Sequence, residues 1–215
     1  MAVVSFLGYK SSTWSQEGSF QSQLVTLSSQ EKPVTMAVAT DLHYLSSSLT
    51  DGGTFFTDLV KNADGKNMFY IEEITESFVA TMIQEKPEIL ILSGDLTFNG
   101  EKQSHLDLEQ KLEKIKENGT QILVMPGNHD IDCSSAAGFF GDSYELVDSI
   151  SKEEFAKIYQ DYGLQESIEK DDTSLSYLYR ARKDFWILML DSNSHGTNEI
   201  SDQTFSWIEE FLKDA

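Results

Sequence analysis

Three apolar segments of this chain each end in a short polar motif whose side chains can bind a metal ion. The motifs are T-D-L-H at 40–43, S-G-D at 93–95 and G-N-H-D at 127–130. Carboxylates, imidazole and a carboxamide oxygen, with no thiolate among them, suit divalent cations such as Mn, Fe or Zn rather than a structural zinc site. One aspartate between two ions about 3.5–4 Å apart can bridge them, and Asp95, central in the order, is the candidate for that position.

The segments that precede these motifs have the composition of buried strands. They are V-T-M-A-V-A-T at 34–40, E-I-L-I-L-S at 88–93 and Q-I-L-V-M-P at 121–126. Helical periodicity at 68–84 and 101–117 separates them, which predicts a parallel βαβ core. The carboxyl ends of parallel strands lie at one edge of the sheet. The following residues are therefore expected to converge there: Asp41, His43, Asp95, Asn128 and His129. Strand-end capping would explain any one of them alone, but not all five together.

The rest of the chain completes an α/β fold. Ser151 and Glu154 form a capping box for a helix at 152–162. Segments 174–180 and 185–191 are expected to be antiparallel strands, which makes the sheet mixed, and a final helix begins near residue 202. The sequence thus predicts a mixed β-sandwich core flanked by helices. Long loops are expected at 44–67 and 131–150, and residues 1–32 form an N-terminal extension with one short strand at 23–27.

Composition and charge exclude several classes of partner and site. The net charge of −20 opposes binding of long nucleic acid, and a small anionic substrate requires a local positive charge such as a metal cluster. The single Cys133 excludes an internal disulfide and is predicted to be an inert thiol. No membrane span and no intact signal peptide is found, which leaves a cytoplasmic protein and an exported one with its signal removed as equal alternatives.

In this order the three motifs resemble those of the calcineurin-like metallophosphoesterases, which read D-x-H, G-D, and G-N-H-D or G-N-H-E. The resemblance covers residues 34 to about 213 and implies metal-dependent phosphoester hydrolysis, in which a hydroxide bridging two ions attacks phosphorus. It implies that Asp41 and His43 bind the first metal, that Asp95 bridges and that Asn128 binds the second. His129 would contact the phosphate and assist the leaving group, and Asp130 would orient His129.

The chain departs from the family in its histidines. The family carries a lone histidine and a G-H-x-H pair after these motifs, whereas this chain has only His43, His105, His129 and His195. We therefore expect residues 33–215 to be a metallophosphoesterase catalytic domain that stops before its last metal-binding motifs. The complete enzyme would hold two divalent ions (Mn, Fe or Zn) with the help of the missing C-terminal region of the same protein. This chain alone would retain at most one weakly held ion and be weakly active or inactive.

The sequence determines the substrate class and the roles of the remaining residues less closely. The segment G-D-L-T-F-N-G-E and the long loop after D-x-H resemble the branch related to cyclic-nucleotide phosphodiesterases, which favours a small phosphodiester of nucleotide size, such as a cyclic nucleotide. A phosphomonoesterase and a non-catalytic binding module that retains the motifs are the alternatives. His105, at the start of an amphipathic helix, is predicted to be a surface or capping residue. Phe139 and Phe140 are expected to anchor their loop on the core, and His195 lies outside the family motifs.

Overall fold

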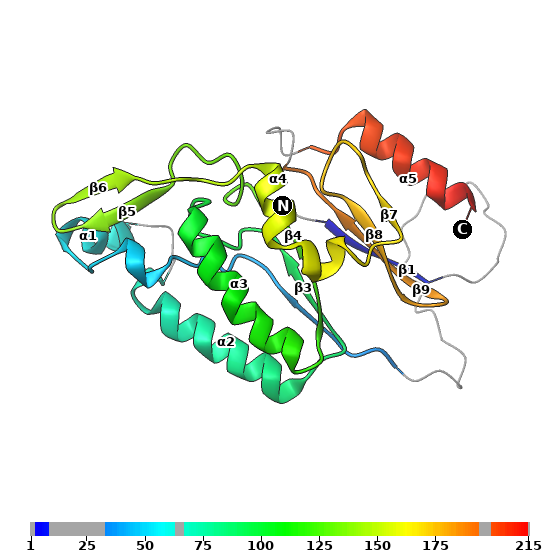
Figure 1. The fold of residues 1–215 in the computed structure, drawn as a ribbon, viewed down its shortest axis with the longest axis horizontal. Helices are drawn as coiled ribbons and strands as arrows, with labels where there is room; N and C mark the ends of the chain where they lie inside the picture. The colour runs from blue at the N-terminus through cyan, green and yellow to red at the C-terminus, as the bar shows by residue number, and fades with distance from the viewer. Residues whose placement is uncertain (1–2, 9–32, 63–66, 194–198, 215) are drawn as a thin grey trace.

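The computed structural model describes residues 3–8, 33–62, 67–193 and 199–214. In these parts of the chain, two β-sheets lie face to face and helices cover both outer faces (Figure 1). This arrangement confirms the predicted α/β sandwich. None of the described helices is both long enough and apolar enough to cross a membrane.

The first sheet is parallel and carries the three polar motifs. Its strands, in the order β2-β3-β4, are β2 (Met36–Ala39), β3 (Ile89–Ser93) and β4 (Gln121–Met125). The crossovers contain α2 (Ile71–Glu85) and α3 (Lys102–Glu117), which lie side by side on one face of the sheet (Figure 1). The predicted βαβ core is therefore confirmed, with every strand end at the same edge.

The second sheet is antiparallel, with the order β1-β9-β8-β7. Its strands are β1 (Val3–Gly8), β7 (Glu169–Lys170), β8 (Tyr177–Arg182) and β9 (Phe185–Leu190). The predicted antiparallel pairing of the last two strands is confirmed, but they belong to a separate sheet and do not extend the parallel one. Strand β1 was not predicted, and the strand expected at 23–27 lies outside the described residues.

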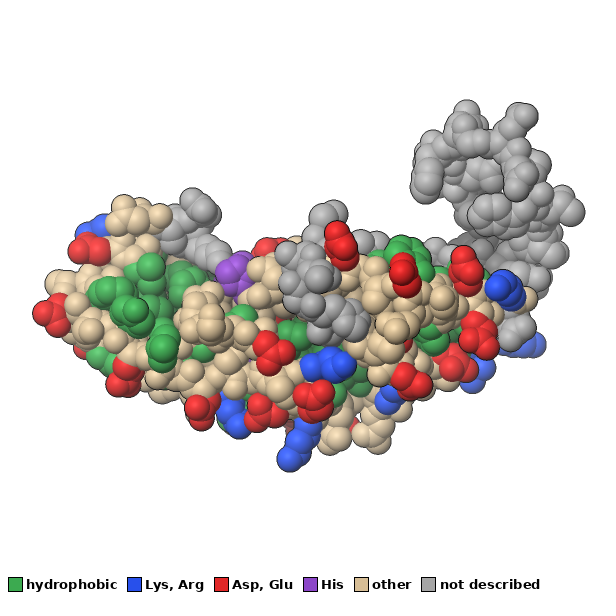
Figure 2. Space-filling view, turned by 90° about the horizontal axis from the view of Figure 1, so that it is seen from above, with side chains coloured by type: hydrophobic (Ala, Val, Ile, Leu, Met, Phe, Trp, Pro, Cys, Tyr) green, Lys and Arg blue, Asp and Glu red, His purple; other side chains and the backbone are tan. Residues whose placement is uncertain are grey.

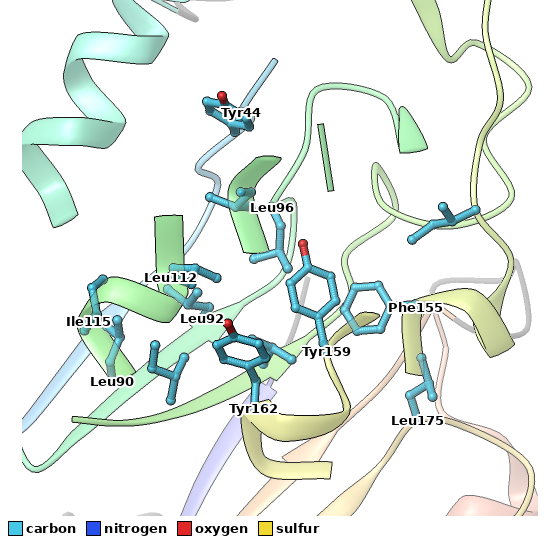
Figure 3. Packing of buried hydrophobic residues seen from close by; sticks show 14 of the residues in the cluster. Tyr44, Leu90, Leu92, Leu96, Leu112, Ile115, Phe155, Tyr159, Tyr162 and Leu175 are labelled. Carbon is cyan, nitrogen blue, oxygen red and sulfur yellow. The ribbon is translucent and has the colours of Figure 1, made fainter. Parts of the chain in front are cut away.

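Alternate residues of the parallel strands face two different cores. Leu90 and Leu92 point to the helices, whereas Ile89 and Ile91 point to the second sheet. This explains why the strands read as continuous apolar runs. Figure 3 shows the helix-side core, where Tyr159 and other aromatic residues from the α4 region pack against the parallel strands. On the far side, α5 (Asp202–Asp214) covers the outer face of β8 and β9.

The capping box predicted at Ser151 and Glu154 is confirmed at the start of α4 (Lys152–Ile158). The helix is shorter than predicted, and the chain after it, Gln160–Leu164, forms an irregular turn in which Tyr162 and Gly163 have non-helical φ and ψ angles. Gly163 lies within this turn at a φ of 101°, where a side chain would be strained and would meet the ring of Tyr177.

The two regions predicted as long loops contain regular structure and pack on each other. They form α1 (Thr54–Asn62) and the hairpin of β5 (Ala137–Phe140) and β6 (Ser143–Leu146), here called the aromatic lobe. Phe139 is buried there among other rings, as predicted, but Phe140 is 40% exposed, so its predicted anchoring role is wrong. Successive residues of a strand point to opposite faces, which explains why only one of the two is buried.

Candidate metal centre

The backbone brings the three motifs into direct contact at the edge of the parallel sheet. The Asp41 N–H donates to the carbonyl of Gly94 (3.1 Å) and the His43 N–H to the carbonyl of Asp95 (2.9 Å), so the segment after β2 runs along the segment after β3. A Cβ on Gly94 would lie 2.9 Å from the Cα of Gly127. A Cβ on Gly127 would overlap the backbone nitrogen and carboxylate of Asp95. Glycine is thus required where β3 and β4 end, because a side chain would force the motifs apart.

Asp41, His43 and Asp95 form a triad of potential metal ligands. One donor atom of each lies within 4.8 Å of the others. His43 Nε2 is 3.6 Å from Asp41 Oδ1 and 3.9 Å from Asp95 Oδ2. Two donors that bind one ion at about 2.1 Å each are separated by roughly 3–4 Å, depending on the angle between them. Both the spacing and the mixture of two carboxylates with one imidazole therefore fit a divalent cation.

The backbone of the triad is in a conformation that ordinary residues rarely adopt. Asp41, His43 and Asp95 have φ angles of 56°, 45° and 51°. In the described parts of the chain, only Lys86 and Asp132 are other non-glycine residues with positive φ. A left-handed conformation costs about 1–2 kcal/mol for a residue with a Cβ, and such strain is concentrated at functional sites. The surrounding fold therefore holds these side chains in place against a local cost.

The third motif lies beside the triad. The His129 N–H donates to Asp95 Oδ1 (3.1 Å), and the His129 ring lies edge-on to that of His43 with the centroids 5.1 Å apart. Asn128 is exposed at the start of the same turn. Figure 2 shows a histidine side chain at the surface, next to apolar side chains at the lobe end of the molecule. The structure thus brings together the residues of all three predicted motifs.

Asp130 has a different position from the one that the family resemblance implied. Its buried carboxylate accepts hydrogen bonds from the backbone N–H groups of Gly127 (2.7 Å), Leu96 (3.1 Å) and Thr97 (2.9 Å). Burial raises the pKa of Asp130 to about 6, although these hydrogen bonds act in the opposite direction. The expected contact with the His129 ring is wrong. Asp130 instead ties the turn after β3 to the turn after β4.

The His129 ring is held by the segment after β3. Its Nδ1 lies 3.0 Å from the carbonyl oxygen of Phe98 and 3.0 Å from Oδ1 of Asn99. A carbonyl oxygen can only accept, so Nδ1 carries the proton. In the neutral ring, Nε2 is then the nitrogen with a free lone pair.

His105 is a core residue, and its predicted surface or capping role is wrong. It is fully buried, with Nε2 at 2.8 Å from the carbonyl of Asp130 and Nδ1 at 3.0 Å from the Tyr159 hydroxyl. Burial lowers the pKa of His105 to about 4, so the ring is neutral at pH 7. The start of α3 is covered by α4, which the sequence of α3 alone does not indicate.

Two further predictions concern Cys133 and His195. Burial, followed by the nearby carboxylates, raises the pKa of the Cys133 thiol to about 11, so it is protonated at neutral pH, as expected for an inert cysteine. His195 lies outside the described residues.

Sequence reasoning missed Asn99 and Glu101 as residues of the site. Glu101 is fully buried, and burial raises the pKa of its carboxyl group. Its Oε2 accepts from the backbone N–H of Asn99 (3.1 Å). Both residues belong to the segment G-D-L-T-F-N-G-E, so the signal was present in the sequence. However, only the folded turn shows that its polar residues face His129 and the core.

Comparison with known proteins agrees with this geometry. A model of the calcineurin-like phosphoesterase family matches residues 34–214, which include all three motifs. The chain therefore belongs to the calcineurin-like phosphoesterase family. A search of curated protein sequences finds no match. The family is one of hydrolases that typically carry two metal ions, and the donor set of the triad is consistent with that class.

Proposed function

We propose that this chain carries the substrate-facing part of a metal-dependent phosphodiesterase that acts on a substrate of nucleotide size. The observation that supports it most strongly is the convergence of Asp41, His43 and Asp95 beside His129, in a chain of the calcineurin-like phosphoesterase family.

In this proposal the metal ligands come from all three motifs. Asp41 and His43 hold the first ion, Asp95 is shared, and Asn128 contributes to the second. When bound, two such ions supply Lewis acidity, which neutralises charge on the phosphoryl oxygens and makes a water molecule more acidic. The net charge of −20 makes this local positive charge necessary for any anionic substrate to bind.

His129 acts on the leaving group. Its Nδ1–H is engaged by the segment after β3, so in the doubly protonated ring Nε2–H is the group that can donate a proton to the departing ester oxygen. As the P–O ester bond breaks, this proton neutralises the negative charge that develops on that oxygen. The residues of this chain therefore orient the phosphate and protonate the alcohol product.

A diester is the preferred substrate class and a monoester is the alternative. The preference rests on the resemblance of G-D-L-T-F-N-G-E to the cyclic-nucleotide branch, and on an acidic surface that disfavours long nucleic acid. A cyclic nucleotide fits both conditions.

We further propose that the second ion requires ligands from another region of the same protein. In the described parts of the chain, the ligand cluster is limited to two carboxylates and one imidazole. By itself this chain would then hold at most one ion, and loosely. The same limited cluster favours a second candidate function, a module that binds a phosphoester or metal ion without turnover.

Substitution of Asp95 tests the proposal. In the complete gene product, Asp95→Ala should abolish hydrolysis of bis-(p-nitrophenyl) phosphate, and in this chain it should remove Mn²⁺ binding measured by calorimetry. Asp132→Ala is the matched control, because Asp132 is exposed and shares the positive φ but lies outside the triad. Unchanged turnover in Asp95→Ala would refute the metal mechanism, and two tight Mn²⁺ sites in this chain would refute the need for further ligands. A faster reaction with p-nitrophenyl phosphate than with the diester would favour the monoesterase.

A further inference from the structure

Two hydrogen-bond acceptors hold the Nδ1 side of the His129 ring. Its Nδ1–H is shared between two acceptors at the same distance, the carbonyl of Phe98 and Oδ1 of Asn99, each at 3.0 Å. The Phe98 side chain is buried in the core of the aromatic lobe, so this carbonyl has a fixed position. The Asn99 side chain is the second acceptor, and it is the one that substitution can remove.

Hydrogen bonds within its own turn fix the backbone of Asn99. Its backbone N–H donates to Oε2 of Glu101 (3.1 Å), and Glu101 is fully buried at the residue that precedes α3. The neighbouring Gly100 N–H donates to the Thr97 hydroxyl (3.1 Å), which closes the turn. The backbone of Asn99 is thus held in place, and from it the side-chain oxygen reaches Nδ1 of His129.

We propose that Asn99, whose backbone N–H is held by Glu101, is a positioning residue for His129, and that its side-chain oxygen orients the ring so that Nε2 faces the leaving oxygen of the phosphoester. The inference rests on the proposed role of His129 as proton donor. In the reaction, the oxygen of the attacking water bonds to phosphorus and releases a proton, and the P–O ester bond breaks with its electron pair on the leaving oxygen. That oxygen takes the proton from Nε2 of the doubly protonated ring, which becomes the neutral Nδ1–H form. Asn99 gains and loses no proton, because it acts only as an acceptor at Nδ1.

The first test is independent of catalysis. The chain has four histidines, so nitrogen NMR of ¹⁵N-histidine-labelled protein can identify each ring. His129 should be the Nδ1–H tautomer, whereas His105, which donates from Nε2 to the carbonyl of Asp130, should be the opposite tautomer. Asn99→Ala should speed exchange of the His129 Nδ1 proton with water about fivefold, the effect of one hydrogen bond.

The matched control is Asn62→Ala, at the exposed end of α1. It should leave the His129 signals unchanged. An Nε2–H tautomer at His129, or the same exchange rate in Asn99→Ala as in the parent chain, would overturn the inference.

The second test uses the complete gene product and varies the leaving group. Asn99→Ala should lower kcat about fivefold or more for an alkyl phosphodiester, whose leaving oxygen needs a proton, and leave KM unchanged. For bis-(p-nitrophenyl) phosphate, whose phenolate leaves without protonation, the loss should be much smaller. Asn99→Asp retains the acceptor and should restore the alkyl substrate to within about twofold of the parent.

The two proposals fail in different ways. An equal loss of kcat for both substrates in Asn99→Ala would show a general structural defect and overturn the positioning role. Turnover that persists in Asp95→Ala would instead refute the proposed function. In that case the tautomer and exchange measurements on His129 still decide whether Asn99 orients the ring.

Discussion

The edge of the parallel sheet has two layers of polar side chains, and they differ in backbone conformation and in the spacing of their polar atoms. In the front layer, Asp41, His43 and Asp95 have positive φ angles, and their donor atoms are 3.6 and 3.9 Å apart, too far for direct hydrogen bonds. In the back layer, Asp130 and His105 are buried and bonded at short distances to backbone groups. The back layer thus stabilises the fold, whereas the front layer retains strain and spacing that suit an ion.

The largest effect is expected in the back layer. Asp130→Ala would leave three buried backbone N–H groups without an acceptor, at about 1–3 kcal/mol each when no water can reach them. We expect the free energy of unfolding to fall by about 3–5 kcal/mol, measured by urea denaturation without metal. Asp95→Ala, which removes a partly exposed carboxylate of the front layer, should cost less than about 1 kcal/mol. Equal losses in the two variants would remove the distinction between the layers.

The two layers also differ in how well they could be predicted from the sequence. The parallel core and its strand ends could be predicted, because continuous apolar runs separated by helical periodicity admit few other arrangements. The residues of the front layer could be predicted for the same reason, since they directly follow the strands. Asp41, His43 and Asp95 do meet at one edge.

The back layer could not be predicted, because it depends on contacts between segments that are distant in sequence. His105 is buried by Tyr159, 54 positions away, and Asp130 accepts from Leu96, 34 positions away. The same limit applies to the aromatic lobe. Its hairpin turns at Gly141 with a φ of 58°, and its buried ring Phe139 packs on Phe55, which belongs to the other presumed loop. No local pattern in the chain encodes which of two loops covers the other.

A second prediction concerns how the contribution of the back layer to the free energy of unfolding depends on pH. The pKa of His105 is about 4 in the folded chain, against an ordinary value of 6.5, so between these values the unfolded chain binds more protons. The stability that the neutral ring provides is therefore complete above pH 6.5 and is lost as the pH falls toward 4. Relative to His105→Gln, the free energy of unfolding of the parent chain should rise by about 2 kcal/mol from pH 5 to 7.5.

Urea denaturation of both chains across this range gives the difference directly. Asp130 contributes with the opposite sign, because its pKa is raised to about 6 and its stabilisation is lost as the pH rises. This contribution is common to both chains and cancels in the comparison. A difference that does not vary with pH would mean that His105 is not held neutral by burial.

The smallest effect is expected in the front layer and has the opposite sign. Asp41 is largely exposed and has a φ of 56°, so Asp41→Gly should relieve backbone strain. Glycine also increases the conformational entropy of the unfolded chain, which offsets part of this gain. We expect a net increase of about 0.5–1 kcal/mol in the free energy of unfolding. It should also weaken Mn²⁺ binding, because one carboxylate of the triad is lost. Asp132→Gly is the matched control, at a φ of 52° outside the triad, and should give the same stabilisation with unchanged Mn²⁺ affinity. A loss of stability in Asp41→Gly but not in Asp132→Gly would mean that the Asp41 side chain stabilises the fold. The front layer would then not reduce stability in favour of metal binding.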